Sequence, residues 1–176
     1  IRNAIYKATG VAIDQDPIPP HVLFQLFTEE GLIRDYGGNT AMYDMSALYQ
    51  AESVQDAIRL RLEHPEAQII AGGTDVLVQM REGKRAGKAL ISIQGCHEMR
   101  GVTLDEEENL RIGSLTTFSH ITADPLIQQY INVLGEAVDM VGGPQIRNAG
   151  TIGGNTCNGV TSADSASTLH AWEALV

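Results

Sequence analysis

The chain has 176 residues, 43% of them hydrophobic, a composition typical of one globular domain with a smaller appendage. Its formal net charge of −10 argues against nucleic acid or an anionic membrane as partner, because both attract clustered Lys and Arg. Cys96 and Cys157 are too few for a disulfide framework or a four-thiolate iron–sulfur cluster, and the simplest setting is the cytoplasm.

The first 41 residues differ in character from the rest of the chain. Apolar spacing predicts a short helix up to Gly10, and the prolines within 11–20 predict extended chain. A second helix is expected between Pro20 and Gly31. Residues 34–41 are polar and rich in glycine, which is linker chemistry. We therefore expect a segment 1–33, a linker 34–41 and a domain 42–176.

After the linker, the sequence predicts alternating helices and strands. Ser53 is a good N-cap for a helix through 53–64, with four residues facing inward: Val54, Ala57, Ile58 and Leu62. Residues 67–83 predict a short buried strand, a glycine turn and a helix, and 89–94 predict another strand.

The remaining elements follow from turn and cap residues. Residues 101–114 predict a hairpin in which Val102 and Leu104 pair with Leu110 and Ile112. Residues 117–140 are expected to be helical in two segments divided near Asp124-Pro125. A last helix within 162–175 is expected to be capped by Ser162 or Asp164. The pattern favours a mixed arrangement of helices and strands over a bundle or a sandwich.

The sequence AGGTD, residues 71–75, joins the predicted buried strand to a helix. Backbone N–H groups at such a junction bind phosphate, and Gly72 and Gly73 have no side chains to keep a ligand away. Thr74 could add a hydroxyl donor, and Asp75 could accept from a sugar hydroxyl or cap the helix. The alternative is a purely structural tight turn.

A second glycine-rich stretch, NAGTIGGNTCNG, occupies residues 148–159. Thr151, Gly153, Gly154 and Asn155 could form an anion-binding nest of N–H groups, or the stretch could be a glycine-rich crossover packed on a sheet. Two such turns in one small acidic chain are better explained by one extended ligand that carries a diphosphate. We therefore expect the two turns to lie side by side on one face of the molecule.

Other candidate residues keep two interpretations each. Cys157 is either a reactive thiol near a ligand or a small buried side chain. Arg147 either balances a phosphate or pairs with a carboxylate. The five histidines show no metal-ligand spacing, and no triad or carboxylate pair supports hydrolysis.

Four segments together resemble a known family. AGGTDVLVQM, LRIGSLTTFSHI, GGPQIRNAGTIGGNTCNG and SADSA, in this order, look like the FAD-binding subunit of the xanthine dehydrogenase group of molybdenum hydroxylases. The resemblance covers Met42 to the end of the chain. Residues 1–27 are similar to the extreme C-terminus of the molybdenum-binding subunit of the same enzymes, so the chain resembles the tail of one subunit joined to the start of the next.

This resemblance implies an α+β fold of the molybdenum hydroxylase (PCMH-like) type, with a small parallel-sheet subdomain and a mostly antiparallel second subdomain, truncated at its C-terminus. It implies that FAD is bound by residues of the two turns and one later carboxylate: Gln68, Ile69, Ile70, Ala71, Gly72, Gly73, Thr74, Asp75, Gly150, Thr151, Ile152, Gly153, Gly154, Asn155 and Asp164. Where some relatives place an aromatic ring against the flavin, this chain has Val141.

The resemblance also implies a function. FAD would pass electrons from iron–sulfur clusters to NAD during purine oxidation, with molybdopterin and 2Fe-2S clusters held only by partner subunits, and no residue of this chain acting as catalytic acid or base. Related hydroxylases of aldehydes, nicotinate or carbon monoxide share the flavin turns. The alternative from another class is a truncated, non-catalytic module that only contacts a partner subunit.

Overall fold

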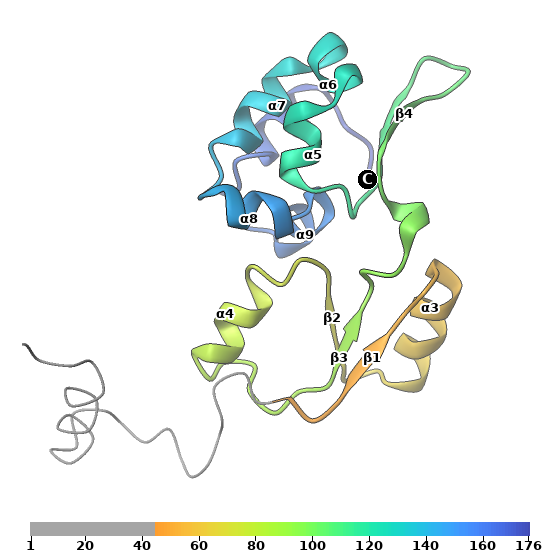
Figure 1. Cartoon of the computed structure of the whole chain (residues 1–176), viewed down its shortest axis with the longest axis vertical. Coiled ribbons are helices and arrows are strands. Elements are labelled where there is room, and N and C mark those ends of the chain that lie inside the picture. Colours follow the sequence, from red (N-terminus) through yellow and green to blue (C-terminus); the bar gives the residue numbers. More distant parts are fainter. Residues whose placement is uncertain (1–44) are drawn as a thin grey trace, which may run out of the picture. The chain divides into compact units, whose positions relative to one another are not determined.

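The computed structural model describes residues 45–176, which lie within a compact unit, Met42–Val176. The two helices and the extended stretch predicted before residue 42 lie outside the described residues, and the proposed boundary at Met42 stays a prediction. Helix and strand labels follow Figure 1.

A three-stranded parallel sheet forms the first part of this unit. Its strands are β1 (Leu48–Gln50), β2 (Gln68–Ile70) and β3 (Leu90–Ser92), in the order β1-β3-β2. Leu90 is in register with Leu48 on one side and with Gln68 on the other, so β3 is central. Leu90 and Ile91 are both buried, which is typical of a parallel strand covered on both faces.

The two helices of this part, α3 (Val54–Glu63) and α4 (Val76–Arg81), cover opposite faces of the sheet (Figure 1). Ile91 packs in a cluster with Leu60 of α3, whereas its neighbour Leu90 packs with Met80 of α4. Successive side chains of a strand point to opposite faces, so the two clusters lie on either side of β3. The strand, turn and helix predicted for 67–83 are thus confirmed.

The predicted inward face of α3 is partly wrong. Ser53 caps the helix as expected, because its side chain accepts a hydrogen bond from the amide of Asp56. Ile58 and Leu62, however, are 55% and 77% exposed, and Leu60 is the buried residue. Apolar residues occur on more than one side of this helix, and the sheet selects the side that carries Ala57 and Leu60.

A β-hairpin joins the parallel sheet to the helical remainder of the unit. After a short 3₁₀ turn (His97–Met99), β4 (Val102–Leu104) pairs antiparallel with β5 (Leu110–Ile112). Val102 lies opposite Ile112 and Leu104 opposite Leu110, as predicted. Asp105 holds the acidic turn by accepting from the amides of Glu107 and Asn109.

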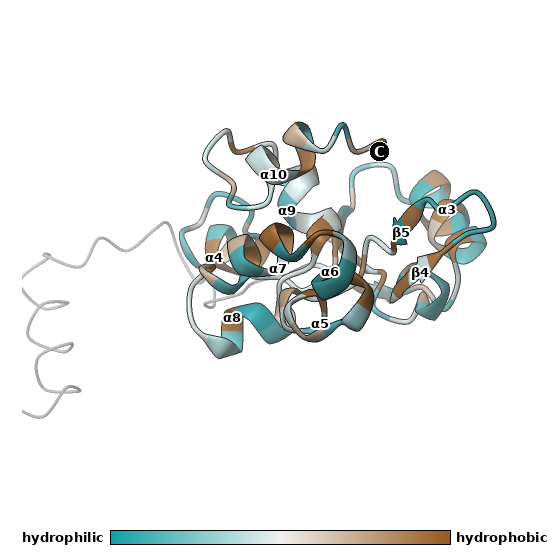
Figure 2. Cartoon of the chain, turned by 90° about the horizontal axis from the view of Figure 1, so that it is seen from above, coloured by the Kyte–Doolittle hydropathy of each residue, from teal (hydrophilic) through white to brown (hydrophobic). Residues whose placement is uncertain are grey.

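Six short helices complete the unit: α5 (Phe118–Ala123), α6 (Pro125–Tyr130), α7 (Asn132–Asp139), α8 (Pro144–Ala149), α9 (Ile152–Asn158) and α10 (Ala166–Ala171). Their apolar residues form a separate core around Phe118, Ile121, Leu134 and Val138. Figure 2 shows both apolar and polar residues along α7. The buried residues of this helix are Leu134, Gly135 and Val138. None of the described helices is both long and apolar enough to span a bilayer.

Two helix boundaries differ from the prediction. The stretch 117–140 contains three helices, because a further break at Ile131 separates α6 from α7 without any proline or glycine signal. Asp124 caps α6 by accepting from the amide of Leu126, as its position before Pro125 suggests. The last helix begins after Ser165, so neither Ser162 nor Asp164 is its N-cap.

Candidate functional site

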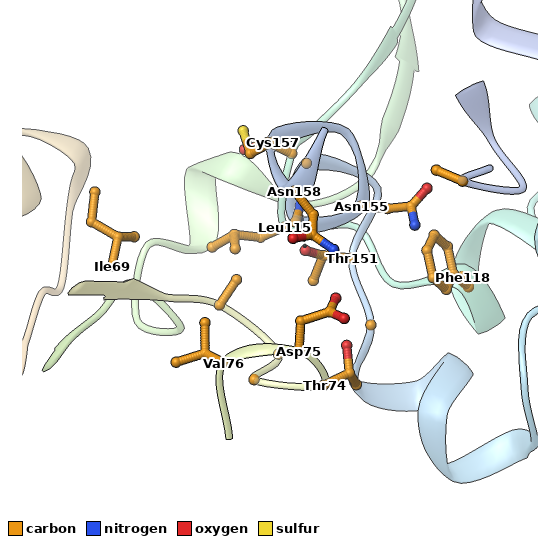
Figure 3. A pocket seen from close by; sticks show the side chains of 18 of the residues that line it. Ile69, Thr74, Asp75, Val76, Leu115, Phe118, Thr151, Asn155, Cys157 and Asn158 are labelled. Carbon is orange, nitrogen blue, oxygen red and sulfur yellow. Dashed lines mark hydrogen bonds between the residues drawn. The ribbon is translucent and has the colours of Figure 1, made fainter. Parts of the chain in front are cut away.

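A cavity of about 740 Å³ opens between the first glycine turn and α9 (Figure 3). Its wall includes residues 71–75 and the start of α9. Leu115, which precedes α5, and Phe118, the first residue of α5, also line it, as do Val141 and Ile146, before and within α8. Pockets for cofactors and other organic ligands have volumes of roughly 300–1,000 Å³. The cavity is therefore large enough for a dinucleotide-sized ligand.

The two glycine turns are in direct contact. A Cβ atom added to Gly72 would lie 1.7 Å from the carbonyl oxygen of Ala149 and 3.2 Å from the amide nitrogen of Gly150. Only glycine permits this approach of backbone to backbone. The expectation that both turns lie side by side is confirmed.

The first turn has unused backbone donors. Among residues 45–176 the amides of Gly72, Gly73, Thr74 and Asp75 form no hydrogen bond. The carbonyl groups of Gly73 and Asp75 accept hydrogen bonds from the amides of Leu77 and Gln79 in α4, each at 2.9 Å. The carbonyls of the turn are thus bonded to the helix, whereas the amides of the turn are unpaired. Unpaired amides in the wall of a cavity can bind an anion such as phosphate.

The side chains of this turn add two oxygen groups. Figure 3 shows Thr74 and Asp75 with their oxygens directed into the space between the turn and α9. Asp75 stands at the N-cap position of α4 but makes no capping hydrogen bond, so its carboxylate is not used to cap the helix. Thr74 can donate to a phosphate oxygen, and Asp75 can accept from a sugar hydroxyl.

The second turn does not form the predicted nest of amides. Residues 152–158 form helix α9, and their leading amides are used within the protein. Ile152 donates to Thr116 O at 3.0 Å, Gly153 to Ser114 O at 2.9 Å, and Gly154 to the Thr151 hydroxyl at 3.1 Å. The amide of Asn155 donates to Thr151 O. Thr151 is the exception in this turn, because its amide makes no hydrogen bond among residues 45–176. The unpaired amides beside the cavity therefore lie mainly in the first turn.

Gly153 of α9 and Gly150 before it serve packing. A Cβ atom on Gly153 would lie 2.6 Å from the Cβ of Ser114, and one on Gly150 would lie 3.0 Å from the ring of Phe118. These contacts seat the helix on residues 114–118, together with the bridge between Thr117 and Thr151. The segment is thus a helix packed on residues 114–118, and not the glycine-rich crossover on a sheet that was the structural alternative, while its side chains reach the cavity.

Asn155 is the side chain of α9 whose orientation is best defined. Its Oδ1 lies 2.5 Å from the hydroxyl of Ser165, which is 1% exposed. This separation fits O–H···O geometry and is shorter than N–H···O bonds, so the hydroxyl donates to Oδ1. The Nδ2 group of Asn155 is then left as a donor at the cavity wall.

Most residues expected to bind the cofactor share this cavity. All line it except Ile70 and Ile152, whose side chains are buried in the two cores. Asp164 lies on the cavity wall and is exposed. Lining residues that sequence reasoning did not single out include Gln79, Arg85, Leu115, Phe118, Ile146 and Val160.

Two residues with open interpretations are now placed. Arg147 pairs with Asp139 at 3.2 Å and donates to the carbonyls of Val141 and Gly142, so its charge is engaged by a carboxylate and by the loop before α8. Cys157 is exposed on the cavity wall, whereas Cys96 is buried, and burial raises the pKa of the Cys96 thiol. Within the described part, His, Cys, Asp and Glu form no cluster that could hold a metal.

The described residues fit FAD. Gly72–Asp75 line the cavity with unpaired amides, and Thr74 and Asp75 add a hydroxyl and a carboxylate. The apolar side chains of Leu115, Phe118 and Val141 also line it. A diphosphate needs donors, a ribose or ribityl chain needs polar partners, and a flavin ring needs apolar walls.

Comparison with known proteins gives the same cofactor. Residues 41–176 match the family described as the FAD binding domain in molybdopterin dehydrogenase. The chain is 43% identical over 133 residues to a putative xanthine dehydrogenase FAD-binding subunit of Escherichia coli K12, covering 76% of this chain and 46% of that protein. It is 36% identical over 108 residues to the nicotinate dehydrogenase FAD-subunit of Eubacterium barkeri, covering 61% and 36%.

A solved structure supports the fold. Carbon monoxide dehydrogenase from Hydrogenophaga pseudoflava superposes with a TM-score of 0.62 at 29% identity, over 69% of this chain and 41% of that one. The chain spans about half the length of the curated relatives it matches. Since the family match extends over residues 41–176, the chain belongs to the FAD-binding domain family of the molybdopterin dehydrogenases.

Proposed function

We propose that this chain binds FAD in the cavity between the first glycine turn and α9, and serves as the flavin part of a xanthine dehydrogenase-like molybdenum hydroxylase. The observation that carries the proposal is the set of unpaired amides at Gly72–Asp75, held against the backbone of Ala149. A row of amides with no partner inside the protein can donate to an anion, and the diphosphate of FAD supplies one.

Each part of the cavity has a task in this proposal. The amides of the first turn and the Thr74 hydroxyl bind the diphosphate, and Asp75 accepts from a ribose hydroxyl. Asn155 donates through Nδ2, with its oxygen held by Ser165. Leu115 and Phe118, each 3% exposed, exclude water from one side of the ring. FAD, when bound, supplies the redox chemistry that links one-electron carriers to a two-electron acceptor, so this chain needs no catalytic acid or base.

The overall reaction we propose is oxidation of purines such as hypoxanthine or xanthine. It is supported by the 43% identity to a putative xanthine dehydrogenase subunit, against 36% for the nicotinate and 33% for the carbon monoxide relatives. Molybdopterin and 2Fe-2S clusters would be held by partner subunits, and NAD would be the final acceptor. The proposal keeps the cytoplasm as compartment, because both cysteines are free thiols.

FAD titration into the purified chain tests the binding proposal. We expect saturable quenching of flavin fluorescence at one FAD per chain, and protection of the exposed Cys157 thiol from alkylation once FAD is bound. A chain that takes up no FAD, while remaining folded by circular dichroism, would favour a non-catalytic module that only contacts a partner subunit.

Reconstitution with the molybdenum and iron–sulfur subunits tests the reaction. We expect xanthine-dependent reduction of NAD by the complete complex, lost when FAD is removed and restored when it is added back. Oxidation of nicotinate or an aldehyde in place of xanthine would refute the purine assignment and leave the FAD site intact.

A further inference from the structure

Arg85 lies in the connection between α4 and β3, ten residues beyond the first glycine turn, and still lines the same cavity. Its Nε donates to Oε1 of Gln79 on α4, and its Nη1 donates to Oε1 of Gln68 on β2. Both glutamines also line the cavity. The guanidinium plane is therefore fixed by two elements that also build the site.

Arg85 is the basic side chain of this cavity. Among the described residues that line it, no other Lys or Arg occurs, while Asp75 and Asp164 both carry carboxylates. The whole chain has a formal net charge of −10. In this acidic protein, an arginine fixed in the wall of the cavity is an attractive group for an anionic or aromatic ligand.

The position of Arg85 indicates which half of a dinucleotide it would contact. Its partner Gln68 directly precedes Ile69 in β2, and Figure 3 shows Ile69 and Phe118 on opposite sides of the first turn. Phe118, Val141 and Asn155 belong to the helical part, on the other side of that turn. The cavity thus extends from the turn in two directions, one toward apolar walls and one toward Arg85.

We propose that Arg85 is a specificity-determining residue that binds the adenosine half of FAD, on the assumption that the cavity holds FAD as proposed above. Arginine has five N–H donors, of which two are used by the glutamines, and its planar cation packs well against an aromatic base. The remaining donors and the flat face recognise adenine or its ribose. This contact makes the site select a dinucleotide over its phosphate alone.

The test measures three ligands against matched variants. FAD binding is followed by flavin fluorescence, and ADP and inorganic diphosphate are measured as competitors. Arg85→Ala should weaken FAD and ADP about 3- to 30-fold, the range of a cation over an aromatic ring, and leave inorganic diphosphate unchanged. Arg85→Lys keeps the charge but loses the planar fork, so it should weaken ADP as well. Arg81→Ala is the control, because Arg81 is exposed on α4 and does not line the cavity.

Two results would contradict the proposed role of Arg85. Unchanged ADP affinity in Arg85→Ala would overturn it, and so would an equal loss for ADP and inorganic diphosphate, since the charge would then act on phosphate alone. Thermal unfolding of all variants shows whether the fold is kept. A wild-type chain that binds neither FAD nor ADP would refute the proposed function itself, and this inference with it.

Discussion

Replacing Gly72 with alanine places a methyl group where the backbone of the second turn lies. The added Cβ would be 1.7 Å from Ala149 O and 2.5 Å from the Ala149 carbonyl carbon, so the two backbones must separate by more than an ångström. No φ strain contributes, because Gly72 does not adopt a left-handed conformation. Forcing a methyl group into packed structure costs about 1–3 kcal/mol, and contact with backbone on both sides favours the upper part of that range.

Gly135 provides the matched control. It lies within α7, and a Cβ there would be 3.5 Å from Cγ2 of Ile127, an ordinary contact. Gly135→Ala should stabilise the chain by about 0.5–1 kcal/mol, because alanine is the better helix former.

Urea denaturation of the FAD-free protein gives the unfolding free energy of both variants, and FAD titration gives the effect on binding. We expect Gly72→Ala to lose both stability and FAD affinity. If its unfolding free energy stays within about 0.5 kcal/mol of wild type, the two turns are not in backbone contact and the reasoning fails.

Three further predictions concern other parts of the unit. Gly153→Ala should destabilise the FAD-free chain, because its Cβ would lie 2.7 Å from Ser114 O; a variant that loses FAD affinity at unchanged apo stability would contradict this packing role. Ser165→Ala should weaken FAD binding about 2- to 10-fold through the lost hydrogen bond to Asn155, with recovery in Ser165→Thr; equal affinity in all three proteins would show that Asn155 needs no fixing. Glu98 accepts a hydrogen bond of 2.7 Å from the amide of Val54, which holds the pKa of its carboxyl below the usual value. Its stabilisation is therefore present above the unfolded pKa of about 4.3 and lost as pH falls through the folded pKa, so acid unfolding curves of Glu98→Gln should lack this part of the pH dependence.

Elements with local signals could be predicted from the sequence. The hairpin follows from alternating apolar residues around an acidic turn, and the start of α3 follows from Ser53 three residues before Asp56. The first turn follows from two glycines between a buried strand and a helix. In each case the determining residues lie within a few positions of one another, so no tertiary contact is needed to recognise them.

Helix α9 could not be predicted in this way. Gly153 and Gly154 each disfavour a helix by about 1 kcal/mol relative to alanine, so the segment is typical of a loop. Two tertiary contacts override this preference: the amide bonds to residues 114 and 116, and the close approach of Gly153 to Ser114. The Thr151 cap adds a local contact. The alternative of an anion-binding nest fails partly for the same reason: Ile152 and Gly153 donate to Thr116 and Ser114, distant in the chain, while Gly154 and Asn155 donate to Thr151.

Arg85 illustrates a second limit of sequence reasoning. It stands in a polar, glycine-bearing connection that resembles any exposed loop, and only the structure brings it back to Gln68 across seventeen residues. Ile58 and Leu62 illustrate the reverse case, because apolar spacing alone does not show which side of a helix the sheet covers. In both cases the surroundings of the residue depend on parts of the chain that are distant in sequence, and the residue type alone does not show them.

Amide hydrogen exchange, followed residue by residue by NMR with and without FAD, tests the central claim most directly. Unpaired amides exchange quickly and hydrogen-bonded ones slowly, so the FAD-free chain should exchange quickly at residues 72–75 and slowly at residues 152–155. Addition of FAD should then slow exchange at 72–75 while leaving 152–155 little changed. Protection that develops at 152–155 instead, with 72–75 unaffected, would contradict the assignment of the diphosphate to the first turn.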